Sequence, residues 1–129
     1  MDRSREPLPT FVRDTPELPS SFGNALDQGL ADLDLTLSST AREAIEAHAR
    51  LLLAWTTAIN LTAIRDPASV ALAHVVDSLS GVAVLRRRGV DRYIDLGSGG
   101  GYPGLPIAAA LPAARALLLE PIGKKAAFL

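Results

Sequence analysis

A ten-residue stretch from Asp95 to Gly104 constrains the fold of this chain more than any other feature. Five of its residues are glycine, half of the ten glycines among 129 residues. The β-type run Tyr93–Leu96 leads into the stretch, Gly104–Leu111 can form a helix, and Ala116–Leu119 has the character of a second buried strand. The order strand, glycine loop, helix, strand predicts a βαβ unit with parallel strands and a right-handed crossover.

The chain before this unit is expected to be helical. Residues 1–21 hold four of the nine prolines and predict a disordered tail, whereas apolar residues recur at helical spacing from Phe22 to Leu33. A second helix, from about Thr40 to Ala58, is expected to turn one face to the core, and a third begins at Asp66-Pro67 and extends to Leu79. The core-facing residues of the second helix are Ile45, Ala49, Leu52, Trp55 and Ile59.

The composition excludes several classes of protein. There is no cysteine, so disulfide frameworks, thiolate zinc sites and cysteine nucleophiles are ruled out together. The formal net charge of −1 excludes a wholly basic nucleic-acid coat, although residues 86–129 carry seven Arg or Lys against three acids. The most apolar stretch, Leu105–Leu119, is broken by two prolines and Arg115, and no secretory signal is evident. We therefore expect a cytoplasmic protein that does not enter a membrane and meets any polyanion with its C-terminal half.

Three ligand classes use a glycine loop of this kind. A phosphate-binding Walker loop does not fit, because Gly123-Lys124 has Leu118 where that motif requires glycine. A dinucleotide fingerprint is present as Gly99, Gly101 and Gly104, although its first glycine comes three residues after Leu96. In the third interpretation, a nucleoside binds with Asp95 at the tip of the first strand and with Gly97, Gly99 and Gly101 alternating after it.

Glu120 fits both the dinucleotide and the nucleoside interpretation. It ends the second predicted strand, 23 residues after Gly97, where a carboxylate can accept hydrogen bonds from both hydroxyls of a ribose. The alternative is that Glu120 caps Gly123 or faces solvent.

The sequence also resembles a known family. The resemblance rests on residues 95–106 and 119–129, and on Trp55, Asn60-Leu61-Thr62, Arg65-Asp66-Pro67 and His74-Val75-Val76-Asp77-Ser78 upstream. In order and spacing these residues resemble the bacterial 16S rRNA guanine-N7 methyltransferases of the RsmG (GidB) family. The resemblance extends from about Leu37 to Leu129.

This resemblance implies an activity and a cofactor. The family transfers the methyl group of S-adenosylmethionine to N7 of one guanine, position 527, in the 530 loop of 16S rRNA, so the implied partner is this rRNA or the small ribosomal subunit. Gly97 and Tyr102 are implied cofactor contacts, and Asp95, Gly99 and Gly101 line the same pocket, with Glu120 on the ribose. Guanine N7 has a free lone pair and no proton to remove, so the reaction requires no metal, thiol or obligatory general base. No obligate protein partner is expected.

Four residues are candidates for a place near the substrate guanine: Asn60, Arg65, His74 and Asp77. His74 and Asp77 share one face of the third helix, and a hydrogen-bonded link between the helical region and the βαβ unit explains them equally well. Arg65, the Arg86–Arg88 turn, Lys124 and Lys125 can contact rRNA phosphates, whereas solvated single charges are the alternative.

The fold class expected from the resemblance is α/β: an N-terminal helical region followed by the first βαβ unit of a class I, Rossmann-like methyltransferase fold, truncated. We expect a disordered tail over 1–21, a helical region over 22–88 and an incomplete S-adenosylmethionine-binding domain over 89–129, with apolar faces of the sheet uncovered and no activity in the isolated chain. Two alternatives stay open. The chain is part of an NAD-dependent oxidoreductase that uses Gly99, Gly101 and Gly104, or a non-enzymatic helical RNA-binding module built on residues 37–85.

Overall fold

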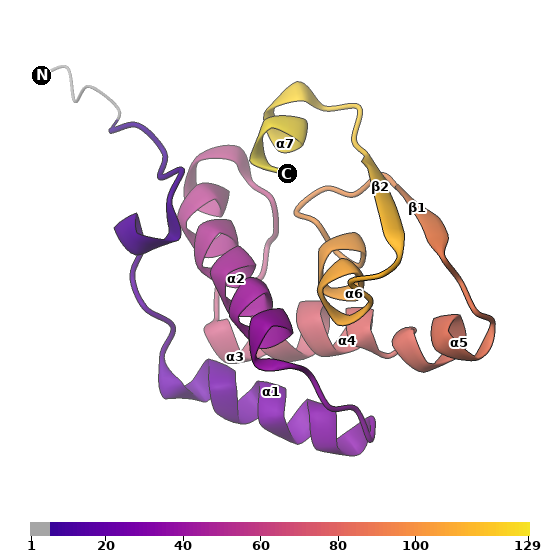
Figure 1. Ribbon diagram of the computed structural model, residues 1–129. Helices are drawn as coiled ribbons and strands as arrows, with labels where there is room; N and C mark the ends of the chain where they lie inside the picture. The colour runs from indigo at the N-terminus through magenta and orange to yellow at the C-terminus, as the bar shows by residue number, and fades with distance from the viewer. Residues whose placement is uncertain (1–5) are drawn as a thin grey trace, which may run out of the picture.

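The computed structural model describes residues 6–129, which form a group of packed helices beside a small parallel sheet (Figure 1). The helices in chain order are η1 (Val12–Asp14), α1 (Ser20–Asp32), α2 (Ser39–Ile59), α3 (Pro67–Val70), η2 (Ala71–Val76), α4 (Asp77–Leu79), α5 (Val82–Arg87), α6 (Gly104–Ala110) and α7 (Gly123–Phe128). The strands are β1 (Arg92–Leu96) and β2 (Arg115–Leu119). Helix and parallel strand in this order confirm the α/β class.

The predicted helix starts follow from their capping residues. The Ser38 side chain accepts a hydrogen bond from the backbone N–H of Ala41 at 3.1 Å and opens α2. The Asp66 carboxylate accepts one from the N–H of Ser69 at 2.9 Å, with Pro67 in the first turn of α3. The third predicted helix is therefore confirmed, and it runs through α3, η2 and α4, whose middle segment η2 is a π-helix that the sequence pattern did not predict.

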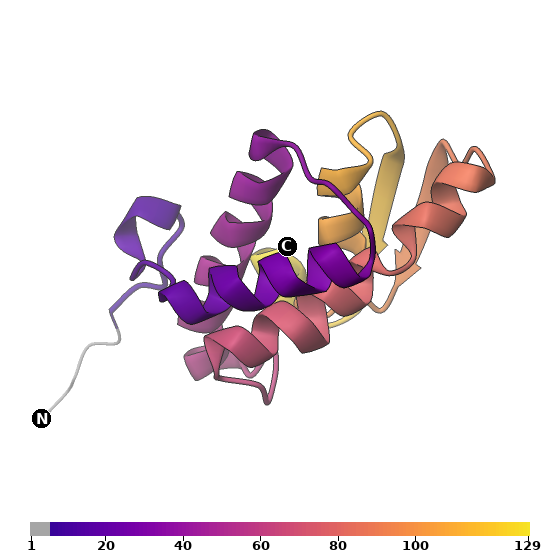
Figure 2. The same ribbon diagram turned by 90° about the horizontal axis from the view of Figure 1, so that it is seen from below.

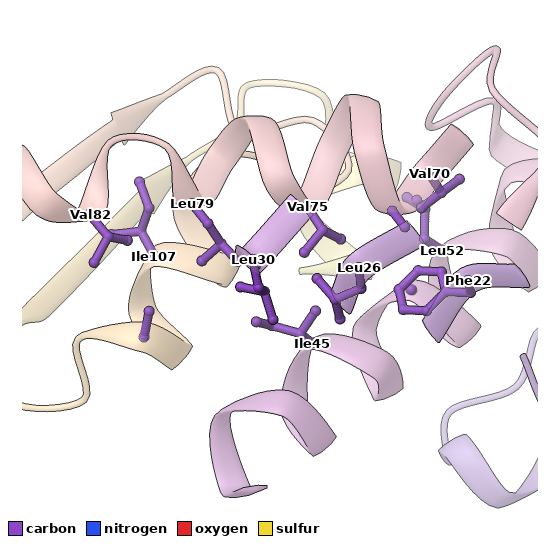
Figure 3. Packing of buried hydrophobic residues seen from close by; sticks show 13 residues of the cluster. Phe22, Leu26, Leu30, Ile45, Leu52, Val70, Val75, Leu79, Val82 and Ile107 are labelled. Atoms are coloured by element: carbon purple, nitrogen blue, oxygen red, sulfur yellow. The ribbon is translucent and has the colours of Figure 1, made fainter. Parts of the chain in front are cut away.

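The core lies where α1 crosses the helices that follow Pro67 (Figures 2 and 3). Gly29 allows this close crossing, because a Cβ atom added there would overlap the side chain of Val76. The buried apolar residues are Phe22, Leu26, Leu30, Ala41, Ile45, Ala49, Leu52, Val70, Ala71, Val75, Leu79, Val82, Ile107 and Ala110. They come from α1, α2, α3 to α5 and α6, so one core joins the helical region to the βαβ unit.

The predicted core face of α2 is correct as far as Leu52 and wrong beyond it. Thr56 rather than Trp55 is buried, one helical turn after Leu52. Its hydroxyl donates to the carbonyl of Thr62 at 3.0 Å, so a polar residue is satisfied in a core position. Trp55 and Ile59 are only half-buried, and the Trp55 indole N–H donates to the carbonyl oxygen of Pro9 at 2.8 Å.

The N-terminal segment differs from the disordered tail expected over residues 1–21. Residues 1–5 lie outside the described part of the chain, and Ser20 and Ser21 already belong to α1. Between them the chain lies along α2, where the Arg50 guanidinium donates to the carbonyl oxygens of Thr15 at 2.6 Å and Pro16 at 3.0 Å. The high proline content did not reveal these contacts, because Arg50 is 34 residues away from Pro16 in the sequence.

The sheet leaves one apolar face uncovered, as the sequence predicted. The strands are parallel with Ile94 beside Leu117 and Leu96 beside Leu119. Ile94 is 59% exposed and Leu117 53%, whereas residues of the opposite face, such as Tyr93, are half-buried against α6. An apolar sheet face of this kind is normally packed against another layer.

Two further sequence expectations need correction. Residues Arg86 and Arg87 belong to α5, and the turn is formed by Arg88 and Gly89 alone. The run Pro67–Arg87, rather than Leu105–Leu119, is long and apolar enough to pass a test for a membrane-spanning helix by length and composition. It includes the buried core residues Val70, Val75, Leu79 and Val82.

Candidate functional site

The glycine loop joins the end of β1 to the start of α6 and is held by the second strand. Gly97, Gly99 and Gly101 all have positive φ, at 75°, 55° and 98°, a region that side chains rarely adopt. The backbone N–H groups of Gly97 and Ser98 both donate to the carbonyl oxygen of Leu119, at 2.7 and 3.1 Å. Glycine is therefore required at these positions by backbone geometry, and β2 fixes the first turn of the loop.

The loop has one open side and one packed side. A Cβ atom added at Gly97 or Gly99 would meet nothing within 4 Å. An added Cβ at Gly100 would lie 2.8 Å from Cδ1 of Leu52, and one at Gly101 would lie 2.8 Å from Nε2 of His48. A ligand can thus approach the backbone at Gly97 and Gly99, whereas Gly100 and Gly101 serve the contact with α2.

Asp95 stands at the end of β1 and faces the start of α6. Its Oδ2 atom accepts a hydrogen bond from the N–H of Gly104 at 3.1 Å, and a Cβ on Gly104 would lie 2.6 Å from the same oxygen. The Tyr93 hydroxyl donates to the carbonyl oxygen of Gly104 at 2.8 Å. The third glycine of the dinucleotide pattern therefore permits close packing between helix and strand.

Glu120 lies at the edge of the open side. Its Oε1 accepts a hydrogen bond from the N–H of Gly99 at 3.1 Å, and its Oε2 accepts one from the N–H of Ile122 at 3.3 Å. The cap that the sequence suggested on Gly123 is formed on Ile122 and Gly99 instead. The carboxylate is half-buried and connects the end of β2 directly to the glycine loop.

Tyr102 fills the space between two histidines from different helices. Its ring centroid lies 4.7 Å from that of His48 on α2 and 4.8 Å from that of His74, onto which it stacks with an interplanar angle of 14°. The Tyr102 hydroxyl is buried and has no hydrogen-bond partner among the described residues, and burial raises the pKa of this phenol. The side chain therefore joins the loop to the helical region.

His48 is a functional candidate that the sequence analysis missed. Its Nε2 lies 2.7 Å from the carbonyl oxygen of Gly100, so this nitrogen carries the proton and donates it. Its Nδ1 is buried without a partner among the described residues. Desolvation lowers the pKa of His48 to about 4, outweighing the bond to Gly100, and the nearby His74 lowers it further. Its sequence position, three residues after Ile45 on the apolar face of α2, was the signal available.

The Asn60-Leu61-Thr62 motif forms the turn that holds His74. Asn60 ends α2 in the left-handed conformation, with φ 52°. The Thr62 hydroxyl lies 2.7 Å from Nε2 of His74 and accepts from the N–H of Ile64 at 3.1 Å. Desolvation lowers the pKa of His74, and the charge of Asp77 opposes this shift only in part. His74 therefore makes its polar contact within the helical region, to Thr62, and reaches the glycine loop by stacking onto the ring of Tyr102.

The structure brings some of the predicted site residues together and leaves others apart. Asp95, Gly97, Gly99, Gly101, Tyr102 and Glu120 all lie in or against the loop, and His74 reaches it through Tyr102. Asn60, Arg65 and Asp77 are exposed, and no hydrogen bond within residues 6–129 joins their side chains to the loop. In the same part of the chain, no three His, Asp or Glu side chains gather in a way that could hold a metal ion.

The fold and the loop together define an α/β protein whose candidate site is a strand-to-helix glycine loop, open on one side and packed on helices on the other. Family comparison then identifies the chain more closely. It belongs to the family described as GidB, rRNA small subunit methyltransferase G, which matches residues 41–129. The resemblance noted in the sequence is thereby confirmed.

Curated relatives agree with this membership. The chain is 45% identical over 102 residues to a ribosomal RNA small subunit methyltransferase G of Ectopseudomonas mendocina (strain ymp), which covers 79% of this chain and 47% of the relative. It is 45% identical over 103 residues to one of Burkholderia cenocepacia (strain HI2424), covering 80% and 45%. With one of Anaeromyxobacter sp. (strain Fw109-5), the identity is 44% over 108 residues, covering 84% and 49%. The chain thus spans about half the length of the curated relatives it matches.

Proposed function

We propose that this chain forms the S-adenosylmethionine-binding part of a methyltransferase that modifies guanine N7, at position 527, in 16S rRNA of the small ribosomal subunit. The observation that carries the proposal is the open side of the glycine loop at Gly97 and Gly99, bordered by Glu120. Membership of a family named for rRNA methylation supports the substrate class. In this proposal residues 22–88 form a helical region, residues 89–129 belong to the cofactor domain, and the protein works in the cytoplasm.

The residues present fit the methyl donor. Gly97 and Gly99 offer bare backbone on the open side of the loop, which suits the amino-acid portion of the donor. The two carboxylate oxygens of Glu120 are each held by one backbone N–H, leaving further lone pairs for ribose hydroxyls. Asp95 holds the loop by accepting a hydrogen bond from the N–H of Gly104, and Gly101 faces His48 on α2. When bound, S-adenosylmethionine supplies an electrophilic methyl group on a sulfonium.

The packed side of the loop favours this donor over NAD. In a dinucleotide fingerprint, the second glycine lets the backbone approach a pyrophosphate. Here that glycine is Gly101, and its Cα faces His48 and Leu105, with an added Cβ 2.6 Å from Cδ1 of Leu105. Protein side chains therefore occupy the side of Gly101 on which a Cβ atom would project.

The role of the protein in this reaction is positioning. Guanine N7 carries an in-plane lone pair and no proton, so the residues must align it and exclude water rather than remove a proton. We place Arg65, Asn60 and Asp77 on the surface that the rRNA meets and His74 behind Tyr102 as a positioning residue. The proposed chemistry uses no metal ion and no obligate protein partner.

Ligand binding to the 129-residue chain tests the proposed cofactor. We expect calorimetry to detect S-adenosylmethionine but not NAD, and Gly97→Val to abolish the signal. Gly89→Val is the matched control, because Gly89 also has positive φ, 60°, and open space around it, yet lies at the end of α5. Unchanged binding by the Gly97 variant, or preference for NAD, would contradict the assignment.

The reaction is tested in a chimera. Residues 41–129 replace the matching half of the Ectopseudomonas mendocina relative, and 16S rRNA from a bacterium lacking its own enzyme is analysed by mass spectrometry. We expect an added methyl group on the target guanine and none with Gly97→Val in the chimera. If rRNA binding survives deletion of residues 92–129 while no methyl transfer occurs in the chimera, the helical RNA-binding module is the better description.

A further inference from the structure

Five arginines form an exposed surface at the end of the sheet opposite the glycine loop. Because the strands are parallel, both start at the same end, beside α5, and the loop leaves from the other end (Figure 1). The arginines are Arg86 and Arg87 in the last turn of α5, Arg88 after it, Arg92 at the start of β1 and Arg115 at the start of β2, and all are exposed. We call this set the arginine edge.

The arginine edge has very little compensating charge. Arg92 and Arg115 are direct neighbours in the strand register, an arrangement in which like charges destabilise a sheet. From Ser78 to Leu119 the sequence contains only two acids, Asp91 and Asp95, and Asp95 lies at the opposite end of β1. Asp91 approaches Arg92 at 3.9 Å, with both side chains highly exposed, so the ion pair is weak.

The helix dipole and local hydrogen bonding explain only some of the five arginines. Arg86 and Arg87 stabilise the C-terminal end of α5 through the helix dipole, and Arg86 also donates to the carbonyl oxygen of Ala110 at 3.3 Å. Neither explanation applies to Arg92 and Arg115, which sit on strands. A hollow of about 330 Å³ is lined by Arg86, Asp91 and residues 110–114. Arg92 and Arg115 line a separate hollow, on the sheet face that carries Ile94 and Leu117.

The residue type indicates which anion fits. All five members are arginine, although the chain has two lysines elsewhere. A guanidinium offers a planar fork of donors that matches the oxygens of a phosphate, and it retains its charge under all ordinary conditions. Neighbouring guanidinium groups on two strands and one helix end suit a row of phosphates rather than a single ion.

We propose that the arginine edge binds the phosphate backbone of RNA and so fixes the register of the substrate on the protein. Four strand residues lie between Arg92 and Gly97, so the arginine edge and the glycine loop are about 17 Å apart along β1. An RNA held at both ends of the sheet would present its base at the loop and its backbone at the arginines. The choice of RNA rests on the proposed function, whereas the phosphate-binding surface rests on the arginines themselves.

Binding of a fluorescein-labelled hairpin of small-subunit rRNA to the 129-residue chain, followed by anisotropy, tests the proposal. The variant R92A/R115A removes two charges from the arginine edge, and R13E changes the net charge equally at an exposed residue of η1. We expect R92A/R115A to weaken binding roughly tenfold at about 0.1 M salt and to reduce the slope of log K against log salt by about 2. R13E should bind within about twofold of the unchanged chain.

A charge-retaining variant and a folding control accompany the binding measurement. R92K/R115K should recover most of the affinity, and circular dichroism should show R92A/R115A as folded, because removing a like-charge pair relieves repulsion. Equal binding by R92A/R115A and the unchanged chain, or an equal loss in R13E, overturns the proposal, as does binding to phosphatidylserine vesicles in place of RNA. Calorimetry with S-adenosylmethionine on the same variants separates the two proposals: a chain that binds RNA through these arginines but not the donor contradicts the proposed function alone.

Discussion

The imidazole of His48 donates a hydrogen bond from Nε2 to the carbonyl oxygen of Gly100 at 2.7 Å, across 52 residues of sequence. This bond joins the long helix α2 to the glycine loop at the side away from the open face. Since Gly100 and Gly101 have no room for a side chain there, the histidine fixes the loop directly on its backbone. The geometry of the candidate site therefore depends on the helical region.

The free energy of unfolding should decrease as the pH is lowered, because His48 must take up a proton. Its folded-state pKa is about 4, below the ordinary value of 6.5, so between these values the unfolded chain binds more protons than the folded one. The contribution of neutral His48 is fully present above pH 6.5 and is lost as the pH falls toward 4. We expect a loss of roughly 3 kcal/mol in the free energy of unfolding, measured by urea denaturation across this range.

The variant His48→Gln isolates that contribution. A glutamine amide can donate to Gly100 from the position of Nε2 but does not titrate. Carboxylates and His74 titrate in both proteins, so the difference between the two pH profiles reports His48. Parallel profiles from pH 7 to pH 4 would contradict the buried, neutral state of this histidine.

Removing the hydroxyl of Tyr102 should stabilise the protein. This hydroxyl is buried and has no partner within residues 6–129, and a buried unsatisfied polar group costs about 1–3 kcal/mol. Tyr102→Phe keeps the ring between the two histidines, so we expect a gain of about 1 kcal/mol in the free energy of unfolding.

Tyr93→Phe is the matched control for that substitution. The Tyr93 hydroxyl donates to the carbonyl oxygen of Gly104 at 2.8 Å, so its removal should lower stability by about 1 kcal/mol. Opposite signs for the two tyrosines are the expected result. A loss of stability in Tyr102→Phe would mean that its hydroxyl has a partner in solution.

Thr62 should be sensitive to substitution because its hydroxyl contacts both Nε2 of His74 and the N–H of Ile64. Thr62→Val has the same shape but leaves His74 Nε2 and the N–H of Ile64 without a partner, and we expect a loss of about 1–3 kcal/mol by urea denaturation. Thr57→Val is the control, since in the described part of the chain the exposed Thr57 hydroxyl donates to Ala54, within its own helix, and to no other residue. NMR titration of His74 in Thr62→Val should show a changed pKa if the two side chains are bonded in solution.

Local signals in the sequence predicted much of this fold. Asp66 and Pro67 mark the start of the third helix by their capping chemistry, and the glycine loop between two apolar runs predicted parallel strands. Contacts between residues far apart in the sequence were harder to predict from local signals. Thr56 takes a core position because the carbonyl oxygen of Thr62 accepts the hydrogen bond from its hydroxyl. The hydrogen-bond partner of Gly100 is His48 on α2. Local periodicity could reveal neither contact.

Gly97 and Gly101 should respond differently to alanine. Both have positive φ, which costs a non-glycine residue about 1 kcal/mol. In Gly101→Ala the new methyl group also collides with His48 and Leu105, and such overpacking adds about 1–3 kcal/mol. Thermal unfolding should therefore show a much larger loss for Gly101→Ala than for Gly97→Ala, and similar losses would mean that the loop is not packed on α2 in solution.

The uncovered face of the sheet should make the isolated chain associate with itself. Ile94 and Leu117 lie side by side on this face, and an exposed apolar pair on a two-stranded sheet offers a surface for a second molecule. We expect sedimentation velocity to show association that increases with concentration and is reduced in Ile94→Thr/Leu117→Thr. Val84→Thr, at an exposed apolar residue of α5, should leave the association unchanged. Concentration-independent monomers of the unchanged chain would show that this face is covered in solution.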